Sequence, residues 1–308
     1  MSKKIADAIG RNRFVGRAKF LRDRLFYRYF RMQGAARARE FAEMLRSSGS
    51  SRLCFTIAFN TPWVIDALTK AWQVHPTGML LVVVDNSSDE AARKSIEDIC
   101  RQREVPYFSL PRNRERHWSR SHGTAVNWVF DNIVRHARPE LFGFIDHDCF
   151  PIASFDMPAR MEGKKVFGLK FGPTENFRYK ANGNDRQWCL WGGFCFFRFS
   201  AVENIAMDFT PRMELGLDTG GGNWLPFYSH LTEEDVSTVE MTFMPVTFGG
   251  ATGEHELFDG AMFHVGGSSY AQLTNTRHHR PAEHRQLLSD YIWNRYLGGI
   301  DGRIVNTP

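Results

Sequence analysis

LFGFIDHD, residues 141–148, is an apolar run that ends in two carboxylates. Such a run is typical of a strand buried on both faces of a parallel sheet. Ligands of open α/β sheets bind where these strands end, and residues two apart in extended chain point the same way. We therefore expect Asp146 and Asp148 to face one side of the chain and His147 to face the other.

The two carboxylates are candidate metal ligands. Two hard oxygen ligands suit Mg²⁺ or Mn²⁺, and a bound diphosphate would supply further oxygens. An isolated pair of acids is more often part of a solvated loop. The position directly after an apolar strand, with Pro151 following, favours the metal site here.

Outward from this stretch, strand and helix patterns alternate. Strands are predicted at residues 53–59, 79–84, 106–110, 141–146, 166–171 and 194–199. Helices are predicted at residues 62–74, 89–103, 124–138 and 284–297, and a glycine-rich turn at 217–223. The alternation predicts an α/β fold with a doubly wound, mostly parallel sheet flanked by helices, and a less regular second half.

The N-terminal segment differs from the rest in charge. Residues 1–46 hold 13 Lys and Arg against 4 Asp and Glu, whereas the remainder holds 26 against 30. Apolar residues recur at helical spacing between these arginines, and the serine-rich residues 47–51 are typical of a flexible linker. We predict a basic helical arm and linker at 1–51 and one domain with halves at 52–155 and 156–308. The arm either lies on an anionic membrane face or packs on the domain.

Composition excludes several classes of protein. The chain has 308 residues, 43% hydrophobic and 24% charged, which is typical of a globular protein. The longest apolar runs are far shorter than a membrane span, and the basic charge of the arm alone does not indicate nucleic-acid binding. Five cysteines without a CxxC pair argue against a disulfide framework or structural zinc and favour the cytoplasm. Neither GxGxxG nor GxxxxGK[ST] is present, which argues against dinucleotide oxidoreductases and P-loop NTPases.

Two further polar motifs follow predicted strands. Asp85 opens the segment DNSSD, where it could bind a ribose hydroxyl or a base, although residues 87–89 could simply cap the next helix. Asn113 follows the third strand, and Asn127 lies in the GTAVN segment that opens a helix. The basic loop RERHWSRSH at 114–122 faces either phosphates or solvent.

Together these motifs resemble the inverting glycosyltransferases of the GT-A fold, close to the large family 2 group. The resemblance covers residues 53–155 through the acidic turn at 85–89, the N…G…A…N segment at 113–127 and the D-x-D motif at 146–148. In the second half, WGGF at 191–194 resembles a glycine pair that precedes the acceptor-side strand. HVGGSS at 264–269 resembles a late H-x-G-G-S segment.

The resemblance implies a metal-dependent enzyme that moves a sugar, with inversion, from a nucleoside-diphosphate-sugar to the hydroxyl of a glycan or lipid-linked acceptor. It implies a role in bacterial surface-glycan or glycolipid synthesis. The cysteines predict a cytoplasmic location, and the arginines that flank an aromatic and aliphatic stripe on the arm predict peripheral contact with the inner membrane face. The charge distribution predicts no nucleic-acid partner. The implied donor-binding residues are Asp85, Asn113, Asn127, Asp146, Trp191, Gly192 and Gly193. The implied ligands of Mn²⁺ or Mg²⁺ are Asp146, Asp148 and His264. His264 could equally be a buried histidine bonded to backbone.

The general base has two candidates. Asp218 lies in LDTGGGN, 25 residues past Gly193, where glycines let backbone and substrate approach closely. Asp235, in TEEDV, resembles the late E-D pair of the family. We favour Asp218, whose alternative role is a helix N-cap. Aromatic residues could also stack on an acceptor sugar, and the candidates are Trp188, Trp191, Trp224, Phe227 and Tyr228.

Two other functions stay open. A nucleotidyltransferase on a similar sheet would need a glycine-rich, basic turn after the first strand, where this chain has NTPW at 60–63. A non-catalytic nucleotide- or sugar-binding protein could use the same fold, because fold does not guarantee activity.

Overall fold

The computed structural model describes residues 22, 25–173, 186–248, 251–269 and 282–305. Its larger sheet has seven strands in the order β3-β2-β1-β4-β7-β6-β8. The first four in this order are parallel: β3 (Tyr107–Ser109), β2 (Leu80–Asp85), β1 (Arg52–Ala58) and β4 (Leu141–Asp146). The other three are β7 (Cys189–Arg198), antiparallel to β4, β6 (Val166–Phe171), antiparallel to β7, and β8 (Val236–Thr238), parallel to β6. The predicted α/β sheet is confirmed.

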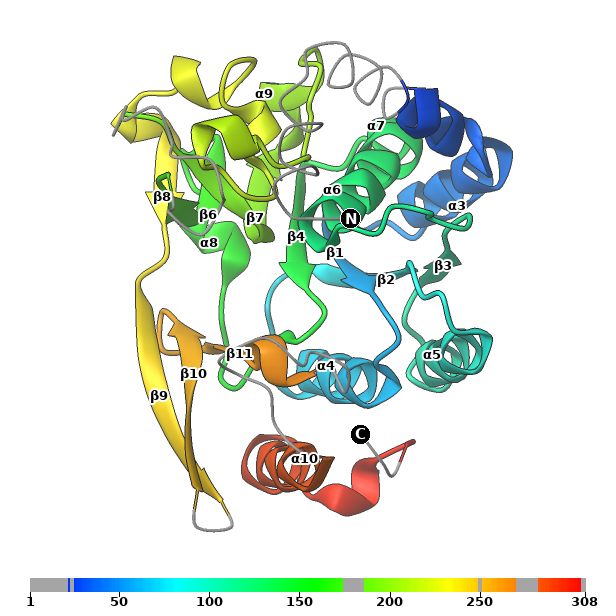
Figure 1. Ribbon diagram of the computed structural model, residues 1–308, viewed down its shortest axis with the longest axis vertical. Coiled ribbons are helices and arrows are strands. Elements are labelled where there is room, and N and C mark those ends of the chain that lie inside the picture. Colours follow the sequence, from blue (N-terminus) through cyan, green and yellow to red (C-terminus); the bar gives the residue numbers. More distant parts are fainter. Residues whose placement is uncertain (1–21, 23–24, 174–185, 249–250, 270–281, 306–308) are drawn as a thin grey trace, which may run out of the picture.

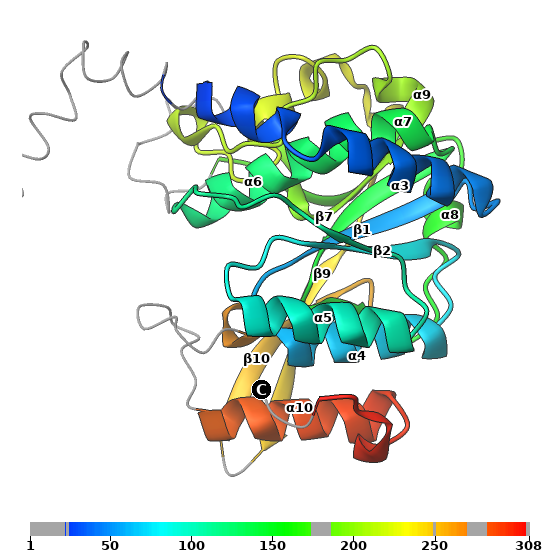
Figure 2. The same ribbon diagram turned by 90° about the vertical axis from the view of Figure 1, so that its right-hand side faces the viewer.

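Helices cover both faces of this sheet (Figures 1 and 2). One face carries α4 (Pro62–Val74) and α5 (Glu90–Gln102). The other carries α3 (Ala35–Ser47) and α6 (Trp118–Val129), and α6 continues through a π-helical turn, η1 (Phe130–Val134), into α7 (Arg135–Ala137). Each face has its own buried core, because alternate residues of a strand point to opposite faces: Cys54 and Ala58 of β1 join one core, and Phe55 and Ile57 the other.

A second, antiparallel sheet begins where β4 ends. The chain turns at His147 and Asp148 and enters β5 (Cys149–Pro151). The order of the described strands in this sheet is β5-β11-β10-β9. Its other strands are β11 (Met262–His264), β10 (Ala251–Phe258) and β9 (Met241–Phe248). The D-x-D motif therefore forms the connection between the two sheets.

The N-terminal residues 25–47 share a core with the larger sheet. Phe30 is 2% exposed, and Ala38, Ala42 and Leu45 of α3 are also buried against the domain. The carbonyl of Ser51 accepts the Glu140 N–H at 2.7 Å, so the serine-rich segment is a short turn between α3 and β1. The rest of the predicted arm, residues 1–21 and 23–24, lies outside the described residues.

The remaining elements are short or peripheral. The C-terminal helix α10 (Ala282–Tyr296) packs against α4 and β9. Short helical segments are α8 (Met157–Arg160), α9 (Phe199–Val202) and single turns at 213–215, 221–223, 228–230, 233–235, 266–269 and 300–302. None of the helices among the described residues combines the length and apolar character that crossing a membrane requires.

Candidate metal and donor site

Asp146, Asp148 and His264 converge where the two sheets meet. One ligand atom of each lies within 4.8 Å of the others. His264 Nε2 is 3.3 Å from Asp148 Oδ1 and 3.9 Å from Asp146 Oδ2. Strand pairing brings the histidine here, because β11 runs beside β5 and places His264 opposite Cys149. The structure thus brings the three predicted metal ligands together, with residues 147–148 in a turn instead of the extended chain that the sequence predicted.

The two carboxylates of this cluster repel each other in a largely buried space. The side chain of Asp148 is 5% exposed and that of Asp146 is 24% exposed. Burial and the charge of Asp148 raise the pKa of Asp146 to about 7. Burial would also raise the pKa of Asp148, but the charge and hydrogen bond of His264 outweigh it and lower that pKa to about 2. A divalent cation would offset this repulsion, so two carboxylates and one imidazole fit Mn²⁺ or Mg²⁺.

Glu256 holds the His264 ring from the side away from the carboxylates. Its Oε2 lies 2.7 Å from His264 Nδ1, and the β10–β11 register pairs the two residues directly. Burial disfavours a charged His264, but the carboxylates of Asp148 and Glu256 raise its pKa well above the usual value. A carboxylate on one ring nitrogen sets the ring's orientation and leaves the other nitrogen for a metal.

Sequence reasoning missed Glu256, because its role depends on the register of a hairpin. Asp259-Gly260 is a strong hairpin dipeptide, and both residues have positive φ, 48° and 67°. As a two-residue loop it would pair Phe258 with Ala261 and Glu256 with Phe263. The structure has a three-residue loop, 259–261, which pairs Phe258 with Met262 and Glu256 with His264, so the dipeptide marks the hairpin but not its register.

Gly192 and Gly193 of β7 make room for the cluster. A Cβ on Gly193 would lie 2.7 Å from Asp146 Cγ, and one on Gly192 would lie 2.4 Å from Thr219 Cγ2. These contacts are too short for real side chains, so any larger residue would displace Asp146 or Thr219. The glycine pair therefore lets β7 pass close to both the cluster and the turn at 217–223.

An aromatic ring borders the cluster. The half-buried Trp191 packs edge to face against His264, with ring centroids 5.2 Å apart. Of the other predicted aromatic residues, Phe227 and Tyr228 are buried in the core at 4% and 1% exposure. Trp188 and Trp224 are half-buried and pack edge to face, with centroids 6.4 Å apart.

The turn that carries Asp218 is tied to β7 beside the cluster. The Gly192 N–H donates to the Thr219 carbonyl at 2.9 Å. Gly220 has φ 101°, and a Cβ there would lie 2.3 Å from the Leu190 carbonyl oxygen, so the close approach requires glycine. The Asp218 carboxylate accepts the Thr219 N–H and caps no helix. Thr219 lies against Gly192 and Asp146 against Gly193, so the structure brings the Asp218 turn and the predicted metal ligands to neighbouring residues of β7.

His122 lies beside Asp146 and was also missed. Helix α6 begins at Trp118, six residues before the predicted start, and this extra length carries His122 Nδ1 to 3.7 Å from Asp146 Oδ1. Burial lowers the pKa of His122 to about 4 despite the nearby charges of Asp218 and Asp148, so the ring is neutral at pH 7. Its Nε2 is buried without a hydrogen-bond partner among the described residues.

Asp85 ends β2 at the same edge of the sheet. Between β2 and β4 lies β1, whose Ala58 pairs with Asp85 and whose Ile57 pairs with Asp146, so two strand spacings, roughly 10 Å, separate the two acids. The Asp85 side chain is fully buried and accepts hydrogen bonds from the Ser87 N–H at 2.8 Å and the Tyr107 hydroxyl at 2.9 Å. Its carboxylate therefore shapes the turn at 85–89 from inside, and Asp89 caps α5 through the Ala92 N–H.

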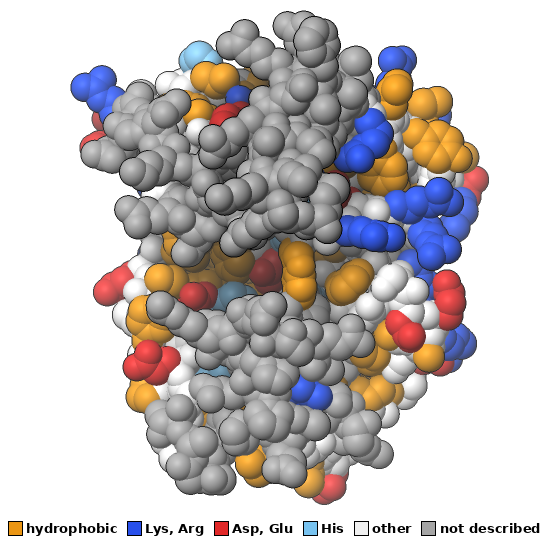
Figure 3. Space-filling view, viewed as in Figure 1, with side chains coloured by type: hydrophobic (Ala, Val, Ile, Leu, Met, Phe, Trp, Pro, Cys, Tyr) orange, Lys and Arg blue, Asp and Glu red, His pale blue; other side chains and the backbone are white. Residues whose placement is uncertain are grey.

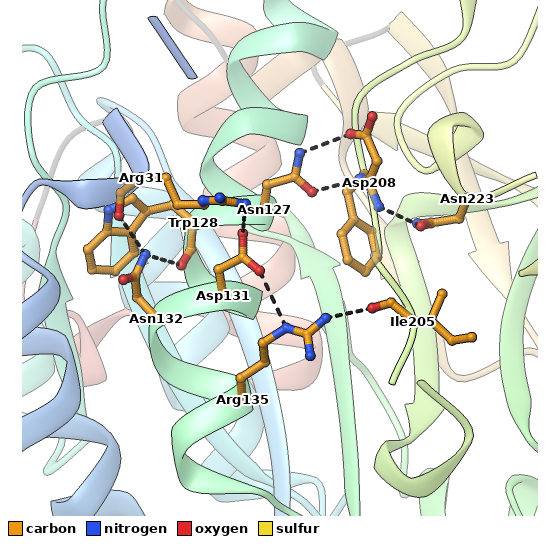
Figure 4. Close-up of polar contacts among 10 residues, drawn as sticks. Arg31, Asn127, Trp128, Asp131, Asn132, Arg135, Ile205, Asp208 and Asn223 are labelled. Carbon is orange, nitrogen blue, oxygen red and sulfur yellow. Dashed lines mark hydrogen bonds and ion pairs between the residues drawn. The ribbon is translucent and has the colours of Figure 1, made fainter. Parts of the chain in front are cut away.

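The two predicted asparagines are bonded within the protein. Asn127 donates to Asp208 Oδ1 at 3.0 Å and accepts the Phe209 N–H at 2.7 Å, as Figure 4 shows. Asn113 donates to the carbonyl of Ser121, the residue before His122. The structure thus gives both asparagines positioning contacts and does not bring their amides to the carboxylate cluster.

Asp235 lies at the opposite end of the sheet. It precedes β8, whose Val236 pairs with Val166, and Val166 in turn pairs with Phe197 near the start of β4. The Asp235 carboxylate is bound by the Thr232 N–H and by Lys165 Nζ at 3.1 Å. The structure does not bring this predicted base candidate to Asp146.

Comparisons with known proteins find similar structures only. No protein-family model matches the chain, and no curated protein sequence matches it significantly. The finer resemblance to the family 2 group therefore stays a prediction.

Several solved glycosyltransferase structures are similar to part of the chain. S. aureus TarS is 13% identical over 79% of this chain and 43% of its own, with a TM-score of 0.41. TarS 1-349 in complex with UDP is 14% identical over 61% of this chain and 57% of its own, with a TM-score of 0.39. The mannosyltransferase PcManGT from Pyrobaculum calidifontis, in complex with GDP-Man and Mn²⁺, is 13% identical over 60% of this chain and 55% of its own, with a TM-score of 0.38. The chain thus matches 43 to 57% of the length of these proteins, and its function has to be argued from its own residues.

Proposed function

We propose that this protein is a metal-dependent glycosyltransferase that moves a sugar from a nucleoside-diphosphate-sugar to an acceptor hydroxyl. One observation carries the proposal: Asp146, Asp148 and His264 form a three-ligand cluster at the carboxyl end of β4, and the turn that carries Asp218 is hydrogen-bonded to the adjacent strand β7. This is the edge of an open α/β sheet where ligands bind.

The cluster would hold Mn²⁺ or Mg²⁺ through Asp146, Asp148 and His264. A cation bound there would neutralise the negative charge that develops on the leaving diphosphate. The buried Nε2 of His122 has no hydrogen-bond partner within the described part of the chain, and a phosphate oxygen of the donor would supply one. Trp191 offers an aromatic ring beside His264 on which a sugar can stack.

We propose Asp218 as the general base that takes the proton of the acceptor hydroxyl. Inverting transfer needs a carboxylate opposite the leaving group, and the Gly192–Thr219 hydrogen bond supports this role by holding the Asp218 turn next to β7. Asp235 is bonded to Lys165 at the far end of the sheet, which argues for Asp218 between the two.

The other implied donor-binding residues would act on the shape of the site. Asp85 would hold the turn at 85–89, whose polar groups follow β2 at the same edge as Asp146. Asn113 and Asn127 would fix the position of α6, and with it His122. Gly192 and Gly193 would keep β7 close to the cluster.

We propose a glycan or lipid-linked acceptor, in bacterial surface-glycan or glycolipid synthesis. A reducing, cytoplasmic location is supported by the five cysteines, which are all buried and unpaired.

The test uses the full chain and a panel of UDP-, GDP-, dTDP- and CMP-sugars, with and without Mn²⁺. A nucleotide present at 100 times its dissociation constant raises the free energy of unfolding by about 2.7 kcal/mol, which a thermal-shift measurement detects. We expect one donor to stabilise the protein in a metal-dependent way and to release its nucleoside diphosphate. Tight binding without turnover under every acceptor condition would favour the non-catalytic binding protein.

A further inference from the structure

The helical segment 25–32 presents two apolar faces, and the domain covers one of them. Phe30 is 2% exposed in the core, and Phe26 stacks on it with ring centroids 6.3 Å apart. Leu25, Tyr29 and Met32 are 68%, 66% and 70% exposed. With about 3.6 residues per turn, these three positions fall on one stripe along the side of the helix opposite Phe30.

This stripe is exposed on a helix that the domain holds firmly. Asn132 Nδ2 donates to the Arg31 carbonyl at 3.0 Å, and Arg31 Nη1 lies 3.1 Å from Asp131 Oδ2 (Figure 4). The Tyr27 hydroxyl donates to Glu115 at 3.1 Å. These contacts, all within the described part of the chain, attach the helix through its inward face, whereas Leu25, Tyr29 and Met32 stay largely exposed.

Basic charge lies beside the stripe. By helical geometry Arg28 borders this stripe, and its side chain is exposed. The segment LFYRYFRM at 25–32 contains no acidic residue. In Figure 3, hydrophobic and basic side chains gather at the upper right, over the N-terminal helices, and acidic and histidine side chains lie near the centre of the same face.

Charge decides between the possible occupants of this stripe. A second copy of the chain would bring more arginines and no acidic residue of 25–32 into a two-fold contact, and like charges brought together cost free energy. An anionic bilayer would meet both features, because apolar side chains enter the headgroup boundary while arginines bind lipid phosphates.

We propose that residues 25–32 dock on an anionic phospholipid bilayer, with Leu25, Tyr29 and Met32 entering its interface and Arg28 on the lipid phosphates. The inference goes beyond the proposed transferase activity and does not depend on it. The sequence left two interpretations of the arm open, packing on the domain and contact with a membrane. In this proposal one face of the helix packs on the domain and the opposite face contacts the membrane.

The test is co-sedimentation of the full chain with phosphatidylcholine vesicles, with and without phosphatidylglycerol. We expect binding only to the anionic vesicles. The variant Leu25→Ser/Tyr29→Ser/Met32→Ser should bind about tenfold more weakly or worse, and Arg28→Gln about fivefold more weakly. The matched control is Leu225→Ser/Phe243→Ser/Ile300→Ser, which removes three apolar side chains of 58%, 60% and 45% exposure elsewhere and should bind as the unaltered chain does.

Thermal unfolding of each variant checks that the fold is kept. Equal vesicle binding by the stripe variant and the unaltered chain would overturn the proposal, as would no binding of the unaltered chain to anionic vesicles. Sedimentation velocity tests for a dimer. If the unaltered chain forms a dimer that only the stripe variant abolishes, and the chain does not bind vesicles, then a second copy covers the stripe and the lipid proposal is rejected.

Discussion

Asp85 and Asp146 end two strands of the same sheet at the same edge, yet their surroundings differ. Both oxygens of Asp85 accept hydrogen bonds from the protein, one from the Ser87 N–H and one from the Tyr107 hydroxyl. Asp146 faces a second carboxylate, Asp148, and its Oδ2 lies 3.9 Å from His264 Nε2. The protein itself supplies the hydrogen bonds that the Asp85 carboxylate needs. Asp146 instead belongs to a pair of carboxylates whose negative charge a bound cation would balance.

This difference in surroundings distinguishes a structural carboxylate from a candidate metal ligand better than the position after a strand does. An acid directly after an apolar strand describes both residues in the sequence. What distinguishes them is the supply of donors, since a buried carboxylate needs hydrogen bonds or a counter-charge. The predictions below alter one side of this comparison at a time.

The largest effect is expected from Asp148→Asn. Loss of one metal-ligand charge removes several kcal/mol of transition-state stabilisation, so transfer with Mn²⁺ should fall by about 10³-fold or more. Titration with Mn²⁺ should show a matching loss of affinity. The control is Asp85→Asn, which should keep the Mn²⁺ affinity of the unaltered chain. Unchanged Mn²⁺ dependence in Asp148→Asn would reject the metal site.

The second effect concerns the base. Asp218→Asn should lose roughly 10²–10⁴ in turnover while keeping donor binding with Mn²⁺, because a general base acts on the acceptor proton and not on the donor. Single-turnover transfer and donor titration separate these two quantities. Asp235→Asn is the matched control and should turn over nearly normally, since Asp235 lies at the far end of the sheet. The reverse pattern would assign the base to Asp235.

Much of the larger sheet could be predicted from the sequence. Strand β4, strand β6 and helix α4 begin and end where the apolar patterns and Pro62 place them. Parallel strands buried on both faces give continuous apolar runs, which a sequence shows directly. The D-x-D motif and His264 were likewise visible as chemistry-bearing residues, although only strand pairing brings them together.

The second sheet could not be predicted in this way. Pro245 lies inside β9 and argues against a strand, but β9 is an edge strand of the described four-stranded sheet, where proline is tolerated. His122 and Glu256 were missed because their roles depend on neighbours. The start of α6 places one, and the hairpin at Asp259-Gly260 places the other.

The third effect tests how the cluster is held. Glu256→Gln should weaken Mn²⁺ binding by about 10–100-fold. A carboxylate bound to a metal-ligating histidine fixes the orientation of the ring and raises the basicity of the nitrogen that binds the metal. Glu254→Gln, on the same strand but exposed, is the matched control and should leave the affinity unchanged. Mn²⁺ titration of both variants gives the comparison without any assay of turnover. Equal affinities would mean that His264 is positioned by its strand alone.

The smallest effect returns to Asp85. Burial raises its pKa above the usual value, against the hydrogen bonds of Ser87 and Tyr107. A carboxyl whose folded-state pKa is raised stabilises the fold fully below its unfolded pKa, near 3.9, and this stabilisation is lost as pH rises through the folded pKa. Asp85→Asn has no ionisable group at this position, so its stability does not change with pH in this way. It does leave one buried donor facing the amide N–H₂, which lowers the free energy of unfolding by about 1–3 kcal/mol. The stability gap between the unaltered chain and Asp85→Asn, measured by urea unfolding, should therefore narrow as pH rises from about 4. A gap that widens with pH would show that the fold favours the Asp85 anion, which would make Asp85 the counterpart of Asp148 and remove the contrast between the two strand ends.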